Sequence, residues 1–144
     1  MKRILVSACL LGCACRYDGK SVKNDAVIAL GKDNILIPVC PEQLGGLPTP
    51  RIPSERIDDK VISQLGADVT KQYKKGADTA LYIYNISSAD FAVLKARSPS
   101  CGKGVIYDGS FSGGFKEGNG VTAELFMKNG IQVFTDEELE NLPI

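Results

Sequence analysis

The chain has 144 residues and is 44% hydrophobic, which is long enough and apolar enough to bury the core of one domain over residues 1–144. Its 17 basic and 17 acidic side chains cancel, which disfavours a nucleic-acid-binding surface because such surfaces carry a basic excess. No apolar run is long enough to cross a membrane. The five cysteines cannot all pair within one chain, so we expect reduced thiols and a cytoplasmic location.

Four short apolar runs predict buried β-strands, because each is rich in aliphatic and β-branched residues and is bounded by turn-forming sequence. The runs cover residues 3–8, 35–39, 91–95 and 131–134. Pro38 lies in the second run and has no backbone donor, so we expect it at a strand end or in an edge strand.

Three segments between these runs predict helices, namely residues 23–31, 67–87 and 120–128. Asn24 is the expected cap of the first, and the second has apolar residues at helical spacing although Gly76 weakens it. Thr135 and Glu138 form a capping-box pattern for a short last helix. The alternation of strands and helices implies a layered α/β fold with a mostly parallel sheet of about four strands.

Two further segments read as loops. Residues 41–56 contain four prolines and two adjacent glycines, which predicts an extended loop. Residues 98–120 are rich in glycine, with a hairpin-like element around the sequence VIYDGSF. Within this segment SPSCGKG is either a plain turn or a nest of backbone donors for an anionic group.

Three cysteines follow three of the predicted strands: Cys9, Cys40 and Cys101. Ligands of open α/β sheets bind at the carboxyl ends of the strands, so these thiols are expected to converge. The chain has no histidine, and thiolates alone suit iron–sulfur clusters, zinc or copper(I). The alternative is that the cysteines are ordinary core residues, which is the role we expect for Cys13 and Cys15.

Two carboxylates stand near turn-forming sequence. Glu42 follows Cys40 by two residues; it is either a solvated surface group or, beside a metal, a group that moves protons. Asp18 precedes a glycine in a Tyr-Asp-Gly turn, where an aspartate normally stabilises the turn through its own backbone. Asp108 stands in a second turn of the same kind.

Several longer motifs resemble a known family. SACLLG, CRYDG, PVCPEQLGGLPTPR, LKARSPSCG, IYDGSFSG and GNGVTAELF occur in this order. Together they resemble domain-of-unknown-function family 523, some of whose members are 2-thiouracil desulfidases. The resemblance extends from about residue 5 to residue 134, which is nearly the whole chain.

The resemblance implies a Rossmann-like fold and a 4Fe-4S cluster on three cysteines, with one iron open to substrate. The residues implied are Cys9, Cys40 and Cys101 as ligands, Glu42 and Ser98 for proton transfer and the attacking water, and Asp18 and Ser100 for substrate binding. The implied substrate is a thiolated nucleobase whose sulfur is exchanged for oxygen without net redox change. Cys15 corresponds to a position that need not be cysteine in the family, and Cys13 lies outside the motif.

Two other classes of function remain open from the sequence. A non-catalytic module would use the cluster, or zinc, for structure or sensing. A cysteine-nucleophile enzyme would use Cys40 or Cys101 as the attacking thiolate, but the chain has no histidine to act as the usual base.

Overall fold

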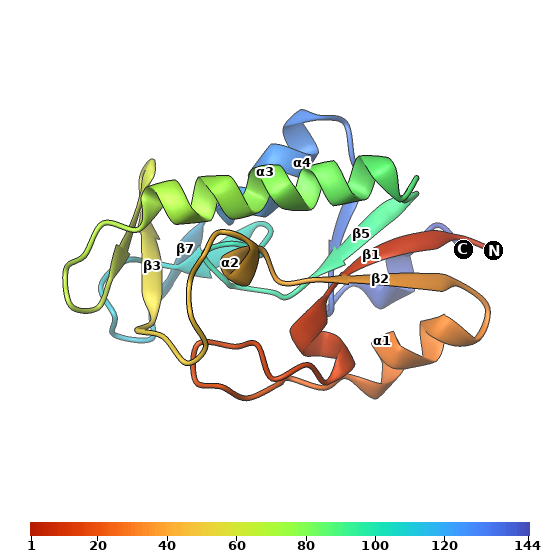
Figure 1. The fold of residues 1–144 in the computed structure, drawn as a ribbon, viewed down its shortest axis with the longest axis horizontal. Helices are drawn as coiled ribbons and strands as arrows, with labels where there is room; N and C mark the ends of the chain where they lie inside the picture. Colours follow the sequence, from red (N-terminus) through yellow and green to blue (C-terminus); the bar gives the residue numbers. More distant parts are fainter.

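A four-stranded sheet forms the centre of the computed structural model, which describes residues 1–144 (Figure 1). Its strands are β1 (Arg3–Ser7), β2 (Ile35–Val39), β5 (Phe91–Leu94) and β8 (Val133–Thr135). The order is β2-β1-β5-β8 and every neighbouring pair is parallel, which confirms the predicted layered α/β fold. Pro38 lies in β2, which is an edge strand, as predicted.

Helices cover both faces of the sheet (Figure 1). The α-helices are α1 (Asp25–Ala29), α2 (Pro41–Leu44), α3 (Thr70–Ile86) and α4 (Val121–Lys128), and the 3-10 helices are η1 (Ala8–Leu11), η2 (Leu30–Lys32) and η3 (Leu139–Asn141). Helices α3 and α4 lie together on one face, and α1 lies on the other. None of them has the length and apolar composition that a membrane span requires.

The core consists of two apolar clusters, one on each face of the sheet. Successive side chains of a strand point to opposite faces, so neighbouring residues of β1 enter different clusters. Leu5 packs with Phe126 of α4 on one face, whereas Ile4 and Val6 pack with Val27 of α1 on the other. This division explains why the central strands read as continuous apolar runs.

Segment 41–56 differs from the predicted extended loop. Pro41 begins the short helix α2, a position where its missing N–H is not needed. The segment ends in β3 (Ser54–Ile57), which pairs antiparallel with β4 (Lys60–Ser63), a hairpin that the sequence analysis did not predict. Its turn contains Asp58 at a positive φ of 53° in place of the usual glycine, so the turn signal was weak.

The other predicted elements are present with shifted ends. Asn24 caps α1 through its side chain, as predicted, but the α-helix ends at Ala29 and continues as η2. The hairpin expected in the glycine-rich segment pairs β6 (Val105–Tyr107) with β7 (Phe115–Glu117). Glu138 accepts the Thr135 N–H at 3.0 Å, as in a capping box, although the helix that follows is only the 3-10 turn η3.

Helices α2 and α3 approach each other so closely that their contact excludes side chains. A Cβ atom on Gly76 would lie 1.9 Å from the Pro41 carbonyl oxygen, and one on Gly45 would lie 2.0 Å from the Gln72 carbonyl oxygen. Gly76 therefore has a packing role that outweighs its low helix propensity. The contact fixes α2, and with it Cys40 and Glu42, against the longest helix of the fold.

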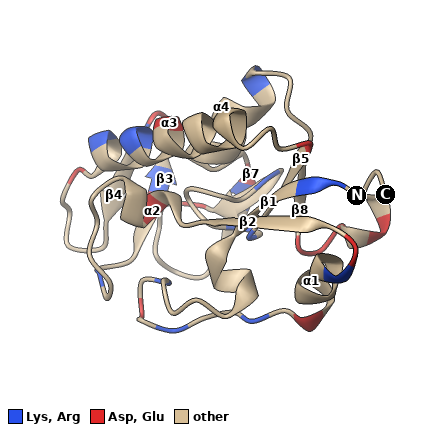
Figure 2. Ribbon diagram, turned by 45° about the vertical axis from the view of Figure 1, so that its right-hand side comes forward, with Lys and Arg blue, Asp and Glu red and all other residues tan.

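Acidic and basic residues occur together along the helices and loops (Figure 2). The amino-terminal half of α3 is the most basic helical segment and carries Lys71, Lys74 and Lys75, which are exposed. The two signs balance over the whole chain.

Candidate active site

A cavity of about 480 Å³ opens at the carboxyl ends of β1, β2 and β5, where the order of the strands reverses direction around β1. Such a switch point is the usual ligand site of an open α/β sheet. All three cysteines line this cavity: Cys9 lies in η1, Cys40 immediately precedes α2, and Cys101 lies in the turn after β5. The structure therefore brings together the three cysteines that the sequence places at strand ends.

The pKa values of two of these thiols, Cys101 and Cys40, are raised. Burial raises the pKa of Cys101 to about 12, although a hydrogen bond with Ser7 opposes the shift. The interaction with the Cys15 thiol, followed by burial, raises the pKa of Cys40 well above its ordinary value. The chain has no histidine to take the protons, so a bound metal is the natural partner that would convert such thiols to thiolates.

The two remaining cysteines lie in different environments. Cys13 is exposed, so the expectation that it packs in the core is wrong. Cys15 is buried, as expected, but it lines the same cavity as Cys9 and Cys40. The interaction with Cys40 lowers the pKa of Cys15, whereas the interaction with Cys9 and burial raise it, with a net value of about 11.

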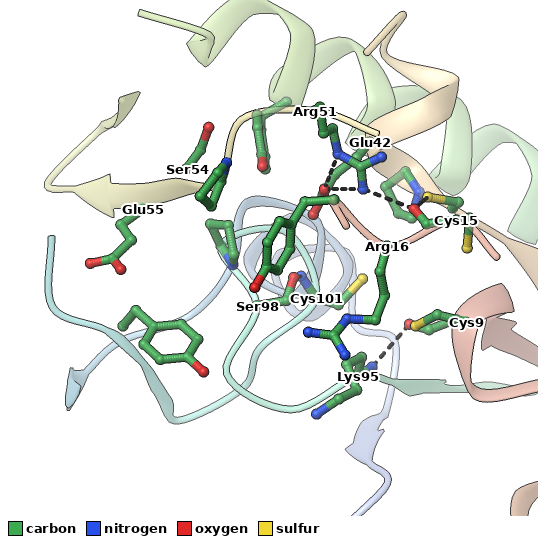
Figure 3. A pocket seen from close by; sticks show the side chains of 18 of the residues that line it. Cys9, Cys15, Arg16, Glu42, Arg51, Ser54, Glu55, Lys95, Ser98 and Cys101 are labelled. Atoms are coloured by element: carbon green, nitrogen blue, oxygen red, sulfur yellow. Dashed lines mark hydrogen bonds and ion pairs between the residues drawn. The ribbon is translucent and has the colours of Figure 1, made fainter. Parts of the chain in front are cut away.

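Glu42 lies in the first turn of α2, and Arg51 holds its carboxylate (Figure 3). The Arg51 Nε donates to Glu42 Oε2 at 2.9 Å, and a second guanidinium nitrogen donates to the same oxygen. That nitrogen also donates to the Cys15 carbonyl at 3.0 Å. The Arg51 side chain is only 7% exposed; burial lowers its pKa, but Glu42 more than offsets this and the net shift is upward.

Ser98 lines the cavity at the start of the turn that carries Cys101. Its Oγ accepts the N–H of Ser100 at 3.0 Å and that of Cys101 at 2.8 Å. These two bonds fix the turn and leave the hydroxyl proton of Ser98 free to be donated. Figure 3 shows the Ser98 and Cys101 side chains side by side.

The two predicted substrate-binding residues do not line the cavity. Asp18 is exposed, accepts the Lys20 N–H at 3.0 Å and lies 3.8 Å from Arg16, which is the turn-stabilising arrangement. Ser100 is buried, and its hydroxyl is hydrogen-bonded to that of Thr122 at 2.9 Å. Both side chains support segments that carry cavity residues, and a role in substrate binding stays a prediction.

Several residues of the cavity were not singled out from the sequence as site residues. Tyr73 of α3 lines it, and burial followed by the charge of Glu42 raises its pKa well above the ordinary value. Arg16 and Lys95 bring positive charge to the lining. Glu55 of β3 is buried and accepts the N–H groups of Gly109 at 2.9 Å and Phe111 at 3.1 Å. It thereby holds the loop after β6 as one wall of the cavity.

The donor set fits a cluster better than a single ion. No three Cys, Asp or Glu side chains come close enough together to hold one metal ion, so a mononuclear zinc or copper site is disfavoured. A cluster that contains several irons and sulfides is wider than one ion, and its ligands stand correspondingly farther apart. Cys9, Cys40 and Cys101 all line the cavity of about 480 Å³, and their sulfur atoms are donors of the type that iron–sulfur clusters use.

Comparison with known proteins places the chain in a family. The family model described as 2-thiouracil desulfurase matches residues 4–138. The chain is 39% identical to the uncharacterised protein YbbK of Bacillus subtilis (strain 168), and the match covers 96% of this chain and 99% of YbbK. It also matches the solved structure of the 4Fe-4S-dependent thiouracil desulfidase TudS (DUF523Vcz) with a TM-score of 0.93 and 44% identity, covering 99% of this chain and 95% of that one. The resemblance found in the sequence motifs is confirmed, and the chain belongs to the 2-thiouracil desulfurase family.

Proposed function

We propose that the protein removes sulfur from thiolated pyrimidine bases such as 2-thiouracil, and that it does so in the cytoplasm with a 4Fe-4S cluster held by Cys9, Cys40 and Cys101. The reaction is a hydrolytic exchange: a thiocarbonyl and water give a carbonyl and hydrogen sulfide, with no change in the total oxidation state. The observation that carries the proposal is the cavity that gathers three thiols, a carboxylate and a hydroxyl from distant segments. The 44% identity to TudS over nearly the full length supports the same reaction here.

When bound, a cluster on three cysteines supplies one iron without a protein ligand as a Lewis acid for the thiocarbonyl sulfur. The sulfur would then carry less negative charge as the ring carbon is attacked. The protein must provide the remaining elements of the reaction, which are a base for water, a proton donor and an enclosed space.

Glu42 is the proposed base. Arg51 hydrogen-bonds only Oε2 of the carboxylate, so Oε1 has no protein hydrogen bond and is available to accept a proton from water. The ion pair also prevents the side chain from turning away from the cavity, because Arg51 is itself hydrogen-bonded to the Pro48 and Cys15 carbonyls. A base held in one orientation loses little entropy when the transition state forms.

Ser98 is the proposed proton donor. Its oxygen already accepts two backbone N–H groups, which makes the hydroxyl proton more acidic. Ser98 therefore meets a substrate as a hydrogen-bond donor. The same bonds fix Cys101 relative to Ser98. The donor and one cluster ligand are therefore positioned by a single turn.

The first experiment is anaerobic purification and cluster reconstitution, followed by iron, sulfide and visible absorption measurements and an assay of uracil and sulfide release from 2-thiouracil. Cys9→Ser, Cys40→Ser and Cys101→Ser are each expected to lose the absorption and the activity. Cys13→Ser, at an exposed cysteine, is the control and is expected to keep both. Reconstituted wild-type protein without bound iron would refute the proposal.

A second experiment separates the base from the cluster. Glu42→Gln is expected to keep the iron content and to lower the turnover number by about 10²–10⁴-fold, the usual contribution of a general base. Glu117→Gln makes the same chemical change at an exposed carboxylate of β7 outside the cavity, and it is expected to behave like wild type. Full turnover in the Glu42 variant would remove this residue from the mechanism.

The hydrolytic, non-redox character has its own test. In isotopically labelled water, and without any electron donor or acceptor, uracil is expected to carry the label at the carbon that bore sulfur. Uracil and sulfide are expected in equal amounts over many turnovers. A requirement for a reductant or an oxidant in each turnover would contradict the proposed chemistry.

A further inference from the structure

A fourth thiol lies inside the cavity without a role in the proposed reaction. The Cys15 residue is 5% exposed, and its thiol interacts with the thiols of Cys40 and Cys9. The Cys40 thiol donates to the Cys15 carbonyl oxygen across 3.7 Å. Cys15 therefore neighbours two of the three residues that would hold the cluster, and it contacts Cys40 through both its side chain and its main chain.

The two segments that carry these thiols are tied to each other. Arg51 donates to the Cys15 carbonyl at 3.0 Å while it holds Glu42 on the other side, and its own N–H donates to the Tyr17 carbonyl at 2.8 Å. The loop that contains Cys15 is thus fixed against α2, and Cys40 is the residue that precedes α2. The proximity of the two thiols is a fixed feature of the fold.

The two thiols differ in accessibility. Cys40 is half-buried and lines the cavity, so a small molecule that enters the cavity can reach it. Cys15 lines the same cavity, but the residue is only 5% exposed, so such a molecule meets less of Cys15 than of Cys40. This pairing of a more exposed thiol with a less exposed neighbour is the arrangement in which a first thiol reacts and a second one resolves the product.

We propose that Cys15 is a resolving thiol: in the cluster-free chain it forms a disulfide with Cys40, driven by a low-molecular-weight disulfide such as oxidised glutathione. The Cys40 thiolate attacks the glutathione disulfide, forms a mixed disulfide and releases one glutathione thiolate. The Cys15 thiolate then attacks the Cys40 sulfur, forms the new bond and expels the second glutathione thiolate. One disulfide is consumed and one is formed, and the protons of the two cysteines pass to the two glutathione thiolates.

The disulfide would remove one ligand from the cluster site, an inference that rests on the ligand assignment in the proposed function. Only Cys9 and Cys101 would remain as thiols in the cavity, so a cluster could not be rebuilt until Cys40 is reduced. The disulfide also protects Cys40 from irreversible oxidation to sulfinic or sulfonic acid.

The test uses cluster-free full-length protein that has been fully reduced and then incubated anaerobically with oxidised glutathione. After the remaining thiols are alkylated, peptide mass mapping is expected to show a Cys15–Cys40 disulfide and no glutathione on either residue. Reconstitution with iron and sulfide is expected to fail with this material and to recover after dithiothreitol is added. A Cys9–Cys15 or Cys9–Cys40 pair, or a persistent glutathione adduct on Cys40, would overturn the proposal.

Two substitutions complete the experiment. Cys15→Ser removes the resolving thiol and is expected to leave glutathione bound to Cys40, whereas Cys13→Ser is expected to give the wild-type disulfide. Cys15→Ala, which keeps a small apolar side chain in the buried position, gives the same result if Cys15→Ser does not fold. Because the mass map needs neither iron nor turnover, it stands even if the reduced chain builds no cluster. Failure to build a cluster would refute the proposed function but not the proposed disulfide between Cys15 and Cys40.

Discussion

The contact between α2 and α3 predicts that Gly76→Ala destabilises the protein, although alanine is the better helix former. In an exposed helix interior the change from glycine to alanine stabilises by about 1 kcal/mol. Here the new Cβ would lie 1.9 Å from the Pro41 carbonyl oxygen and 2.8 Å from the Pro41 carbonyl carbon. Carbon contacts are comfortable at about 3.5–4.0 Å, so α2 would have to move away by well over an ångström.

The expected size follows from two opposing effects. Overpacking a tight contact costs about 1–3 kcal/mol, or more where the clashing atom belongs to the backbone and cannot rotate away. After the propensity gain of about 1 kcal/mol is subtracted, a net loss of about 0–2 kcal/mol remains, and because the clashing atom belongs to the backbone we expect Gly76→Ala to lower the free energy of unfolding by about 2 kcal/mol, the upper end of this range. Since Cys40 and Glu42 move with α2, the variant is also expected to retain less iron after reconstitution.

Urea unfolding followed by circular dichroism measures the stability, and iron analysis measures the site. Lys75→Ala is the matched control because Lys75 is exposed on the same turn of α3, and a surface change of this kind is worth within about 0.5 kcal/mol. If Gly76→Ala stabilises the protein by the amount expected for a free helix and keeps full iron, the close contact between α2 and α3 is not what determines the position of Cys40.

Three further predictions test other contacts of the structure. Arg51→Met is expected to lower both turnover and iron retention, because it removes the restraint on Glu42 and on the segment that carries Cys40; with turnover expressed per bound cluster, adding Glu42→Gln is expected to cost no more than Glu42→Gln alone, because coupled residues are not additive. Thr122→Val leaves the buried Ser100 hydroxyl without its partner and is expected to lower the free energy of unfolding by about 1–3 kcal/mol in a urea titration. For Glu138, burial raises the pKa, but its backbone N–H and lysine partners outweigh burial and the pKa falls below the ordinary value of 4.5. The stability this carboxylate contributes is therefore present above about pH 4.5 and is lost as the pH falls through the lower folded-state value, so Glu138→Gln is expected to flatten the loss of stability between pH 5 and pH 3.

The parallel sheet could be predicted from the sequence because its signal is local. Each strand is a continuous apolar run, and β1 and β5 are buried on both faces, so no alternation was needed to recognise them. Segment 41–56 differs from the predicted loop because its prolines do not interrupt the helix and strand that form there. Pro41 instead starts a helix, and Pro53 directly precedes a strand, positions where a missing donor costs little.

The candidate site likewise has one part that could be predicted from the sequence and one part that could not. The convergence of Cys9, Cys40 and Cys101 follows from the direction of parallel strands, which is a property of the fold class and can be read without coordinates. The contacts of Arg51 and Cys15 depend on how the proline-rich loop folds back over the loop after η1, which no local pattern encodes. The sequence showed only that both residues stand inside the family motifs.

The segment from Cys40 to Arg51 is the part of the chain on which the whole site depends. It supplies one proposed ligand and the proposed base, and it is held on one side by the glycine contact with α3 and on the other by the Arg51 bonds to the loop that carries Cys15. Neither restraint involves the sheet. A change that loosens one of them can therefore displace Cys40 and Glu42 together while β1, β2 and β5 stay paired. It follows that substitutions in this segment affect cluster retention and turnover more than they affect the free energy of unfolding. Substitutions of the apolar residues in the central strands affect the free energy of unfolding more than they affect cluster retention and turnover.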